Sequence, residues 1–394
     1  MKHTFLDLGT QPIANKFLQE AGEDEYKFNL TVEFDDETKL VSLGNFVRPE
    51  LMFNDSYVYH SSNSDTMRKH FKDYSQLLKE DFNPQKVLEI GSNDGVFVRN
   101  FDQKTTIAVE PCGNFAQLTN AMHYETYNEF WSMDLAKRII KEHGKRDLIS
   151  SSNCICHIQN LDEAFAGISE CLSEDGIFVF EDPSLILMLE RVSYDQIYDE
   201  HAHIFSVTAL QNLLNRNGLE IFRVDNLEVH GGSNRIYACK IGARNVEKSV
   251  AVNLEFEDKH GIGDLKTYQD FARKVQKSKD SLNDILIDLK SKGKKIVSYG
   301  ATSKSTTVFN YCGIGPDLID YIVDTTADKQ GKLSPGMHIP VVSPDSGFDE
   351  TVDVAFLGAW NYEKEILAKE QRFIKDGGKF ITHIPYVRVV GTSA

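Results

Sequence analysis

The stretch Val87-Leu-Glu-Ile-Gly-Ser-Asn-Asp-Gly-Val-Phe-Val98 decides the fold of this chain. Two apolar residues lead through Glu89 into a loop that contains Gly91 and Gly95, and a helical pattern follows. A strand that turns through glycines into a helix presents unpaired backbone N–H groups and lets a ligand approach the main chain closely. The spacing differs from the Gly-x-Gly-x-x-Gly of a dinucleotide site, which makes NAD the poorer interpretation.

A carboxylate follows the next apolar run along the chain. Glu110 comes directly after Ile107-Ala-Val109, where a fold of this kind places an acid for the ribose hydroxyls of its ligand. The loop also fits the first motif of class I S-adenosylmethionine (SAM) methyltransferases, an acidic residue before Gly-x-x-x-Gly. The alternative is a structural turn in a doubly wound sheet. We expect the SAM site to include Glu89, Gly91, Asn93, Gly95, Glu110, Pro111, Ser151 and Asn153.

Length and composition bound the class of protein. The chain has 394 residues, 41% of them hydrophobic and 26% charged, which suggests two or three domains of a soluble globular protein. The formal net charge of −16 argues against nonspecific nucleic-acid binding, because that needs a cationic face. No apolar run is long enough to span a bilayer, and the first residues do not resemble a signal peptide. The six cysteines include no Cys-x-x-Cys pair, so we expect reduced thiols and a cytoplasmic enzyme.

Three regions follow one another along the chain. Residues 1–65 contain short alternating segments and predict a small strand-rich unit. Residues 66–243 alternate strands with helices, which predicts a Rossmann-like class I methyltransferase domain with a mostly parallel sheet. Residues 244–394 begin with a charged helix and repeat this layout, which predicts a second Rossmann-like α/β domain with a glycine after one strand and an acid after the next. The expected strands are 26–34, 39–43, 87–90, 106–109, 147–150, 176–180, 295–300, 318–324, 352–357 and 379–384, and the expected helices are 65–82, 134–143, 161–172 and 265–290.

A second polar cluster lies in Asp195-Gln-Ile-Tyr-Asp-Glu-His-Ala-His-Ile-Phe-Ser206. On a helix or turn, neighbouring residues of this stretch can share one opening. A carboxylate beside a histidine can hold its ring in one tautomer and poise it near neutral pH. The alternative is a solvated polar loop. Further along, His230-Gly-Gly-Ser-Asn-Arg235 combines an open backbone with groups that suit oxyanions, or else is a turn that ends in a surface arginine.

Taken in order, the motifs resemble those of the sugar C-methyltransferases, which use SAM to methylate nucleotide-linked 4-keto-deoxysugars. The resemblance runs nearly from end to end, and so many matches in order are more specific than any single motif. The matching segments are Leu8-Gly-Thr-Gln-Pro-Ile-Ala-Asn-Lys-Phe-Leu18, Pro49-Glu-Leu-Met-Phe53, Tyr57-Val-Tyr-His-Ser-Ser62, Glu89 to Gly95, Glu110-Pro111, His157, Tyr198-x-Glu200-His201, His230-Gly-Gly-Ser-x-Arg235, Tyr299-Gly-Ala-Thr302, Asn310-Tyr-Cys-Gly-Ile314, Lys329-Gln-Gly331 and Pro335-Gly-Met-His-Ile-Pro340.

The resemblance implies methylation of a carbon. A sugar C–H loses its proton readily only beside a ketone, where the carbanion delocalises into an enolate, and by resemblance the 4-keto group activates C3. We expect His201 to be the general base, Glu200 its orienting partner and Tyr198 a donor to the developing charge. His157 should stabilise the enolate or position the substrate, unless it merely caps a strand end. His203 is expected to be structural.

Other residues are expected to close the site and to hold the nucleotide. Tyr57, Tyr59 and Ser61 should reach the cofactor from the amino-terminal unit, or else belong to inter-domain core. The partner is a nucleotide-linked sugar, with no nucleic acid and no membrane, and the protein should be a monomer. The residues expected to bind the substrate are His230, Gly231, Gly232, Ser233, Arg235, Tyr299, Lys304, Lys329 and His338.

The chain departs from the family pattern in two places. Relatives usually carry four cysteines that hold a structural zinc in the amino-terminal unit, whereas the first cysteine here is Cys112, so we expect no zinc and a unit stabilised by packing on its neighbours. Ser303-Lys-Ser-Thr-Thr307 is more hydroxyl-rich than the glycine-containing loop of relatives, which leaves the base and the sugar open. Two other functions also remain open, namely methylation of a sugar oxygen or nitrogen and a non-catalytic homologue.

Overall fold

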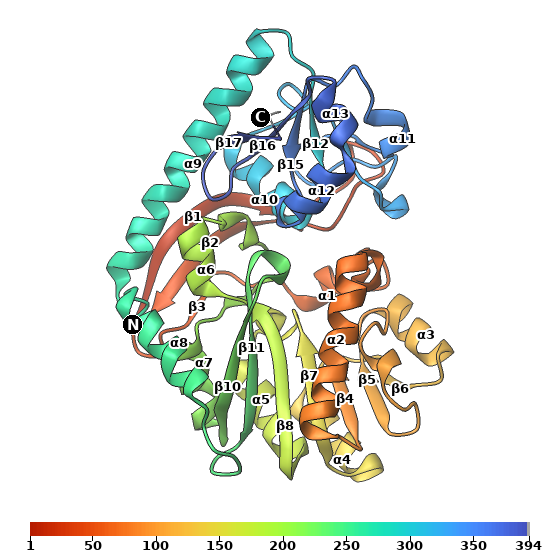
Figure 1. The fold of residues 1–394 in the computed structure, drawn as a ribbon, viewed down its shortest axis with the longest axis vertical. Helices are drawn as coiled ribbons and strands as arrows, with labels where there is room; N and C mark the ends of the chain where they lie inside the picture. Colours follow the sequence, from red (N-terminus) through yellow and green to blue (C-terminus); the bar gives the residue numbers. More distant parts are fainter. Residues whose placement is uncertain (392–394) are drawn as a thin grey trace.

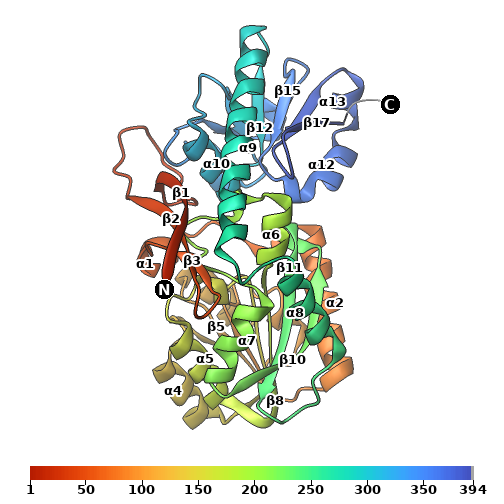
Figure 2. The same ribbon diagram turned by 90° about the vertical axis from the view of Figure 1, so that its left-hand side faces the viewer.

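The computed structural model describes residues 1–391, except the side chain of His230. These residues form three sheets. Figure 1 shows the central sheet (green to orange) below the carboxy-terminal sheet (blue), with β1 and β2 (red) between them. Helix α9 (Leu265–Ser291) runs along one side of the molecule and packs on β1 (Figure 2). None of the helices in the described part of the chain combines the length and the apolar character that a membrane crossing requires.

The amino-terminal sheet has the strand order β1-β2-β3-β9. Alternate residues of β2 are buried, as the sequence indicates, and the rings of Phe5 and Phe34 pack against Tyr268 of α9 at centroid distances of 5.0 and 4.4 Å. The last strand comes from much later in the chain and carries His203, whose Nδ1 lies 2.9 Å from Ser42 Oγ. The strands are β1 (Lys2–Pro12), β2 (Lys27–Asp35), β3 (Val41–Leu43) and β9 (His203–Ile204), and helix α1 (Pro49–Met52) follows β3.

The central sheet has the strand order β10-β11-β8-β7-β4-β5-β6, with β11 antiparallel to both neighbours and the other pairs parallel. This topology confirms the expected Rossmann-like class. Helix α8 packs on β10 and α7, so the central unit extends past residue 243. The strands are β4 (Val87–Ile90), β5 (Thr106–Val109), β6 (Glu125–Tyr127), β7 (Arg146–Ser152), β8 (Leu172–Pro183), β10 (Leu219–Leu227) and β11 (Ser233–Lys240). The helices are α2 (Asp65–Phe82), α3 (Gly113–Ala121), α4 (Met133–His143), α5 (Leu161–Cys171), α6 (Leu185–Arg191), α7 (Val207–Arg216) and α8 (Lys248–Lys259).

The helix expected after the first glycine loop is only the single 3₁₀ turn η2 (Val98–Asn100). The Asn100 side chain donates to the carbonyls of Val96 and Phe97, both at 3.0 Å, and the Arg99 guanidinium donates to those of Asp94 and Gly95. These side chains occupy the carbonyls that a continuing helix would use, which favours a turn.

The carboxy-terminal sheet has the order β14-β13-β12-β15-β16-β17 and is parallel except for β17. The connection between β1 and β2 docks on this domain, since Leu18 pairs with Leu333 and the Thr306 hydroxyl donates to the Ala14 carbonyl at 3.1 Å. The strands are β12 (Ile296–Tyr299), β13 (Tyr321–Val323), β14 (Val341–Val342), β15 (Val354–Leu357), β16 (Lys379–Thr382) and β17 (Arg388–Val390). The helices are α10 (Ser303–Cys312), α11 (Pro344–Gly347), α12 (Glu363–Lys369) and α13 (Gln371–Lys375).

Candidate active site

A cavity of about 730 Å³ lies between the central sheet, the segment after α1 and the carboxy-terminal domain. It receives residues from the carboxyl ends of strands in both Rossmann-like domains, where ligands of such sheets bind. The predicted site residues in its wall are Tyr57, Tyr59, Ser61, Gly91, Asn93, Glu110, Pro111, Asn153, His157, Tyr198, Glu200, His201, Tyr299, Lys304 and Lys329.

The cofactor end of the cavity is built around Glu110. Its carboxylate accepts the backbone N–H of Asn93 at 2.7 Å and that of Cys112 at 2.9 Å. Burial raises the pKa of this carboxyl, and the two N–H donors act against that shift. Each carboxylate oxygen keeps further acceptor capacity. The group therefore fits the ribose hydroxyls of an adenosine-containing cofactor.

The segment before α2 crosses over the glycine loop. The Ser61 N–H donates to Asn93 Oδ1 at 2.9 Å, and Asn93 Nδ2 donates to the Tyr59 carbonyl at 3.0 Å. The Ser62 N–H donates to Asp94 Oδ2 at 3.0 Å. The Asn93 side chain thus ties Tyr59 and Ser61 to the glycine loop. Asn93 also lines the cavity, and its contact with SAM stays a prediction.

Three residues expected at SAM lie outside the cavity wall. Glu89 is buried in β4, where burial raises its pKa well above the usual value. Gly95 packs against Thr119, whose Cγ2 would lie 3.0 Å from a Cβ at this position. The Ser151 hydroxyl donates to the Ile90 carbonyl at 2.9 Å. These residues support the loop rather than face the cavity.

His201 is oriented by a backbone carbonyl. Its Nδ1 lies 2.6 Å from the Gln196 oxygen, and because a carbonyl only accepts, Nδ1 carries the proton. Its Nε2 lies 2.8 Å from the Tyr198 hydroxyl, which donates to it. Burial and the nearby Glu200 carboxylate raise the pKa of Tyr198 well above the usual value, so this phenol keeps its proton at physiological pH.

The Glu200 carboxylate accepts hydrogen bonds from the amino-terminal segments, whereas we expected the His201 ring as its partner. The Glu200 carboxylate accepts from Asn15 Nδ2 at 2.6 Å and from the Tyr57 hydroxyl at 2.9 Å. Glu200 thereby links the amino-terminal unit to the site. The role of orienting the histidine ring belongs to Gln196.

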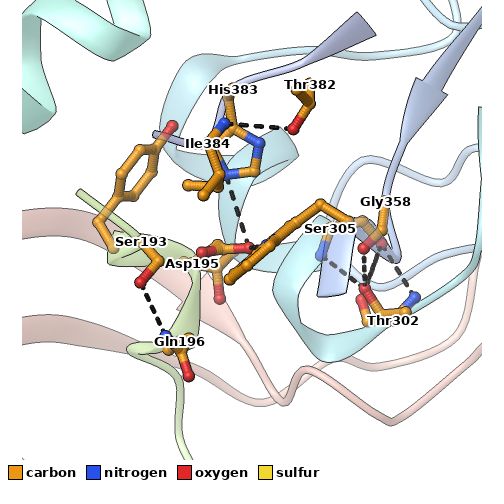
Figure 3. A network of polar contacts seen from close by, with 12 residues as sticks. Ser193, Asp195, Gln196, Thr302, Ser305, Gly358, Thr382, His383 and Ile384 are labelled. Atoms are coloured by element: carbon orange, nitrogen blue, oxygen red, sulfur yellow. Dashed lines mark hydrogen bonds and ion pairs between the residues drawn. The ribbon is translucent and has the colours of Figure 1, made fainter. Parts of the chain in front are cut away.

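The turn that carries Gln196, η4 (Tyr194–Gln196), is held by the carboxy-terminal domain (Figure 3). Asp195 is fully buried, accepts from the Trp360 indole N–H and lies 3.5 Å from Nε2 of His383. The Thr307 hydroxyl donates to the Ile197 carbonyl at 3.2 Å. The position of the His201 ring therefore depends on the docking of the two domains.

His157 lies between two aromatic rings. It stacks on Phe53 at 5.2 Å and on His201 at 5.4 Å between centroids. Burial lowers the pKa of His157 to about 3, so its ring is neutral at physiological pH. Its Nε2 is buried and has no hydrogen-bond partner among the described residues. The residue nevertheless lines the cavity beside Tyr198 and His201.

Two lysines bring positive charge to the far end of the cavity. Burial lowers the pKa of both Lys304 and Lys329, and the Glu200 carboxylate acts against the shift in each. Lys329 Nζ donates to the Ala301 carbonyl at 2.7 Å. Tyr299 also lines the cavity, and its hydroxyl donates to Glu370 at 2.7 Å.

Residues 231–235, which we expected to bind the substrate, do not line the cavity. Arg235 Nε donates to Glu181 at 2.6 Å, and its guanidinium lies 4.1 Å from the Tyr74 ring centroid. The Ser233 hydroxyl donates to the Val229 carbonyl at 3.2 Å. Gly231 packs on Trp360 and Gly232 on Leu187. The motif is a packed turn next to a buried ion pair, and the side chain of His230 lies outside the described residues.

The expected role of His338 is corrected in the same way. Its Nε2 lies 2.8 Å from a Glu25 carboxylate oxygen, where the β1–β2 connection meets the carboxy-terminal domain. It thus contributes to docking and not to the cavity wall.

Several cavity residues were not expected from the sequence. Asn15 belongs to the motif of residues 8–18, and Asp324 ends a predicted strand. The sequence could therefore have pointed to both as site residues. Gln196 acts through its backbone, which no side-chain pattern marks. The further residues of this kind in the wall are Phe130, Trp131, Cys154, Asn361 and Lys369.

Three domain families match the chain in succession. Residues 1–53 match a putative zinc-binding domain, residues 63–224 a methyltransferase domain, and residues 228–385 a C-methyltransferase C-terminal domain. The first match raises the question of a structural zinc.

The amino-terminal residues do not fit a zinc ion. Structural zinc is held by cysteine and histidine side chains, and no cysteine precedes Cys112. Within residues 1–391, the one group of three ligating side chains that lie close together is Cys156, His157 and His201. That group lies in the cavity region, far along the chain from the matched domain.

The purified protein should contain no stoichiometric zinc and should keep its activity in a strong chelator. The physical reason is that the amino-terminal unit has no thiolates to hold a zinc ion. The packing of β1 and β2 on α9 stabilises this unit instead. Elemental analysis and a turnover assay with chelator check this. About one tightly held zinc per chain would overturn it.

Methyltransferases are among the relatives and solved structures found by comparison. The chain is 30% identical over 397 aligned residues to the C-methyltransferase NovU of Streptomyces niveus, covering 99% of this chain and 94% of that protein. A SAM-dependent methyltransferase from Clostridium acetobutylicum aligns with a TM-score of 0.37 at 15% identity, over 46% of this chain and 94% of its own. An O-methyltransferase from Brevibacillus brevis, solved with S-adenosyl-L-homocysteine, aligns with a TM-score of 0.34 at 15% identity, over 49% and 80% of the two chains. The full-length match to NovU shows that this chain belongs to the C-methyltransferase family.

Proposed function

We propose that the protein transfers a methyl group from SAM to C3 of a nucleotide-linked 4-keto-deoxysugar through an enolate. The observation that carries this proposal is one continuous cavity. It joins the Glu110 site to the His201–Tyr198 pair and continues to Lys304 and Lys329. Such a cavity suits a cofactor at one end and a substrate with an anionic group at the other.

The acid–base chemistry follows from the tautomer of His201. Because Nδ1 carries the proton, Nε2 is the basic nitrogen and takes the C3 proton of the substrate. The electron pair of the broken C–H bond passes to the ketone oxygen, where the Tyr198 hydroxyl leaves Nε2 and donates to the enolate. When bound, SAM would supply an electrophilic methyl group to the carbon that proton removal has made nucleophilic, with the electron pair of the broken S–CH₃ bond left on the sulfur of S-adenosylhomocysteine and the ketone restored.

His157 has a different part in this proposal. A base with a pKa near 3 is too weak to remove the C3 proton at neutral pH, because an efficient base titrates near the working pH. A neutral imidazole still donates one hydrogen bond. We therefore assign His157 to positioning the substrate or to the enolate oxygen. The ketone itself is required for carbon methylation only, which separates this function from O- or N-methylation.

The two lysines support the nucleotide end of the proposal. A diphosphate is an anion that lysine binds well in proteins. Lys304 and Lys329 lie in the same cavity wall as Glu200, and the Glu200 carboxylate interacts with both ammonium groups. A diphosphate bound by the lysines would therefore lie near the residues that are proposed to act on the sugar. Tyr299 belongs to the same cavity wall.

Replacing Glu110 with alanine should weaken SAM binding much more than nucleotide binding. Deleting a charged hydrogen-bond partner typically costs about 1.5–3 kcal/mol, which is roughly ten- to hundredfold in affinity. Calorimetric titration of the folded variant with SAM measures the loss. A wild-type SAM affinity would mean that the cofactor binds elsewhere.

The function itself is tested by incubation with SAM and a panel of nucleotide-linked 4-keto-6-deoxysugars. Product mass shows whether a methyl group is added, and carbon-13 NMR shows which atom carries it. We expect a new C–CH₃ signal at the carbon next to the ketone. A methyl group on oxygen or nitrogen would refute carbon methylation, and SAM binding without turnover on any sugar would indicate a non-catalytic homologue.

A further inference from the structure

The two Rossmann-like domains close their first turn in the same way. In the central domain, the Gly91 N–H donates to the Val109 carbonyl at 2.8 Å, and in the carboxy-terminal domain, the Gly300 N–H donates to the Val323 carbonyl at 2.8 Å. Both glycines have a positive φ, of 77° and 103°. In each domain, therefore, the turn after one strand is tied to the end of the neighbouring strand.

An acid follows that neighbouring strand in both domains and is held by the same two kinds of donor. Glu110 accepts the N–H of Asn93 in the turn and that of Cys112, two residues further on, at 2.7 and 2.9 Å. Asp324 accepts the N–H of Ala301 in the turn and that of Thr326, two residues further on, at 2.7 and 2.8 Å. The hydrogen-bonding arrangement around the Glu110 carboxylate is thus repeated around the Asp324 carboxylate.

Asp324 also faces the same space as Glu110. Both belong to the wall of the 730 Å³ cavity, together with Gly300 and Thr326. Each oxygen of the Asp324 carboxylate accepts one backbone N–H and keeps acceptor capacity for a hydroxyl group. An acid in this position of a Rossmann-like domain binds the hydroxyls of a nucleoside sugar.

We propose that Asp324 binds the furanose hydroxyls of the nucleoside part of the substrate. The inference rests on the proposed function, because it takes the substrate to be a sugar nucleotide. It assigns the two equivalent acids to two different nucleosides, Glu110 to the adenosine of SAM and Asp324 to the nucleoside of the substrate.

The charges between Asp324 and the catalytic pair agree with this orientation of the substrate. Burial lowers the pKa of Lys329, and the carboxylates of Asp324 and Glu200 both act against the shift, which indicates that the ammonium lies near both acids. Its Nζ contacts the carbonyl of Ala301, the residue whose N–H binds Asp324. A diphosphate at Lys329 then has the nucleoside on the Asp324 side and the reacting sugar on the Glu200 side.

The first test changes the ligand and leaves the protein intact. Full-length protein is titrated calorimetrically with UDP, CDP, GDP and dTDP, and then with the analogue of the tightest binder that lacks every furanose hydroxyl. Deleting hydrogen bonds to a charged group should weaken binding roughly ten- to hundredfold. This comparison does not depend on whether any variant folds.

The second test places the effect on Asp324. Asp324→Asn keeps one oxygen for a backbone N–H but removes the charge, and should lose nucleotide affinity by roughly tenfold or more while SAM affinity stays near wild type. It should also no longer distinguish the parent nucleotide from its hydroxyl-free analogue. Glu110→Gln is the matched control and should show the reverse, a loss of SAM affinity with nucleotide affinity kept. Circular dichroism establishes that both variants are folded.

The outcomes separate this inference from the proposed function. If the hydroxyl-free analogue binds wild-type protein as tightly as its parent, Asp324 only supports the turn and the inference is wrong, whereas methylation of the sugar panel can still succeed. If the analogue is weaker but Asp324→Asn keeps the full distinction, another residue binds the hydroxyls and the inference is again wrong. If none of the four nucleotides binds, the inference and the sugar-nucleotide part of the proposed function both fail.

Discussion

Replacing His201 with alanine should lower turnover by about 10²–10⁴-fold, the usual contribution of general-base catalysis. Affinities for SAM and for the sugar nucleotide should stay near wild type, because proton abstraction occurs only on the way to the enolate. Because Nδ1 donates its proton to the Gln196 carbonyl, Nε2 is the nitrogen that acts as the base, and the alanine variant lacks it. Steady-state kinetics and calorimetric titration of the same preparation measure the two effects separately.

Hydrogen exchange isolates the first chemical step of this prediction. In heavy water without SAM, the wild type should exchange the C3 hydrogen of a 4-keto sugar nucleotide for deuterium, because the base lies in the wall of an open cavity. His201→Ala should not exchange it. Product mass or proton NMR at C3 gives the result.

His157→Ala is the matched control for the base. This histidine stacks on His201 but has a pKa of about 3, so its removal should slow turnover without abolishing exchange. If His201→Ala exchanges and methylates normally while His157→Ala does neither, the base is His157.

The central strands could be predicted from sequence because their burial is complete. All four residues of β4 and all four of β5 are buried, and both strands are short, mainly apolar runs followed at once by loop residues. A strand covered by helices on both faces needs no alternation, so its hydrophobic run alone marks its bounds. The predicted and observed bounds of these two strands agree.

Strand β1 could not be predicted in the same way. Its pairing with β2 shifts register between Thr4 and Leu6 and again between Asp7 and Thr10. The first shift leaves both Phe5 and Leu6 buried, which interrupts the alternation by which a half-buried strand is recognised. Irregular pairing of this kind depends on the partner strand.

The catalytic pair shows a second limit of sequence reasoning. Glu200 and His201 are adjacent, which suggested a carboxylate–imidazole pair, but Glu200 bonds to Asn15 and Tyr57 while His201 bonds to the Gln196 carbonyl. Every residue has a carbonyl, so composition cannot show which one orients a ring. The sequence placed Tyr198, Glu200 and His201 together, and all three line the cavity, whereas the bonds that each of them makes depend on how the turn folds.

The segment 231–235 shows a related limit. Glycine, serine and arginine suit an anion site and a packed turn equally well. Here Arg235 is only 6% exposed, and its charge is paired with that of the buried Glu181. The partner Glu181 lies 54 positions away in the sequence, so the sequence around Arg235 does not show that the arginine is buried and paired.

Replacing Tyr198 with phenylalanine should lower turnover by about 10²–10³-fold, the typical cost of losing one donor to a developing oxyanion. The change deletes only the hydroxyl that contacts His201 Nε2 at 2.8 Å, and the raised pKa of this phenol keeps it a donor in the wild type. Binding of SAM and nucleotide should stay near wild type, because the hydroxyl is needed only once charge develops. Steady-state kinetics and calorimetry measure both quantities.

Tyr57→Phe is the matched control, since Tyr57 is another tyrosine of the cavity wall and its hydroxyl donates to Glu200. Its loss removes one hydrogen bond to a carboxylate that has a second donor in Asn15, so turnover should fall much less than in Tyr198→Phe.

Deuterium exchange at C3 also distinguishes the two variants. A donor to the enolate stabilises the intermediate of exchange itself, so Tyr198→Phe should slow exchange and methylation together, whereas Tyr57→Phe should change neither strongly. Equal losses in the two variants would mean that Tyr198 has no special contact with the enolate and that its hydroxyl only holds the ring of His201 in place.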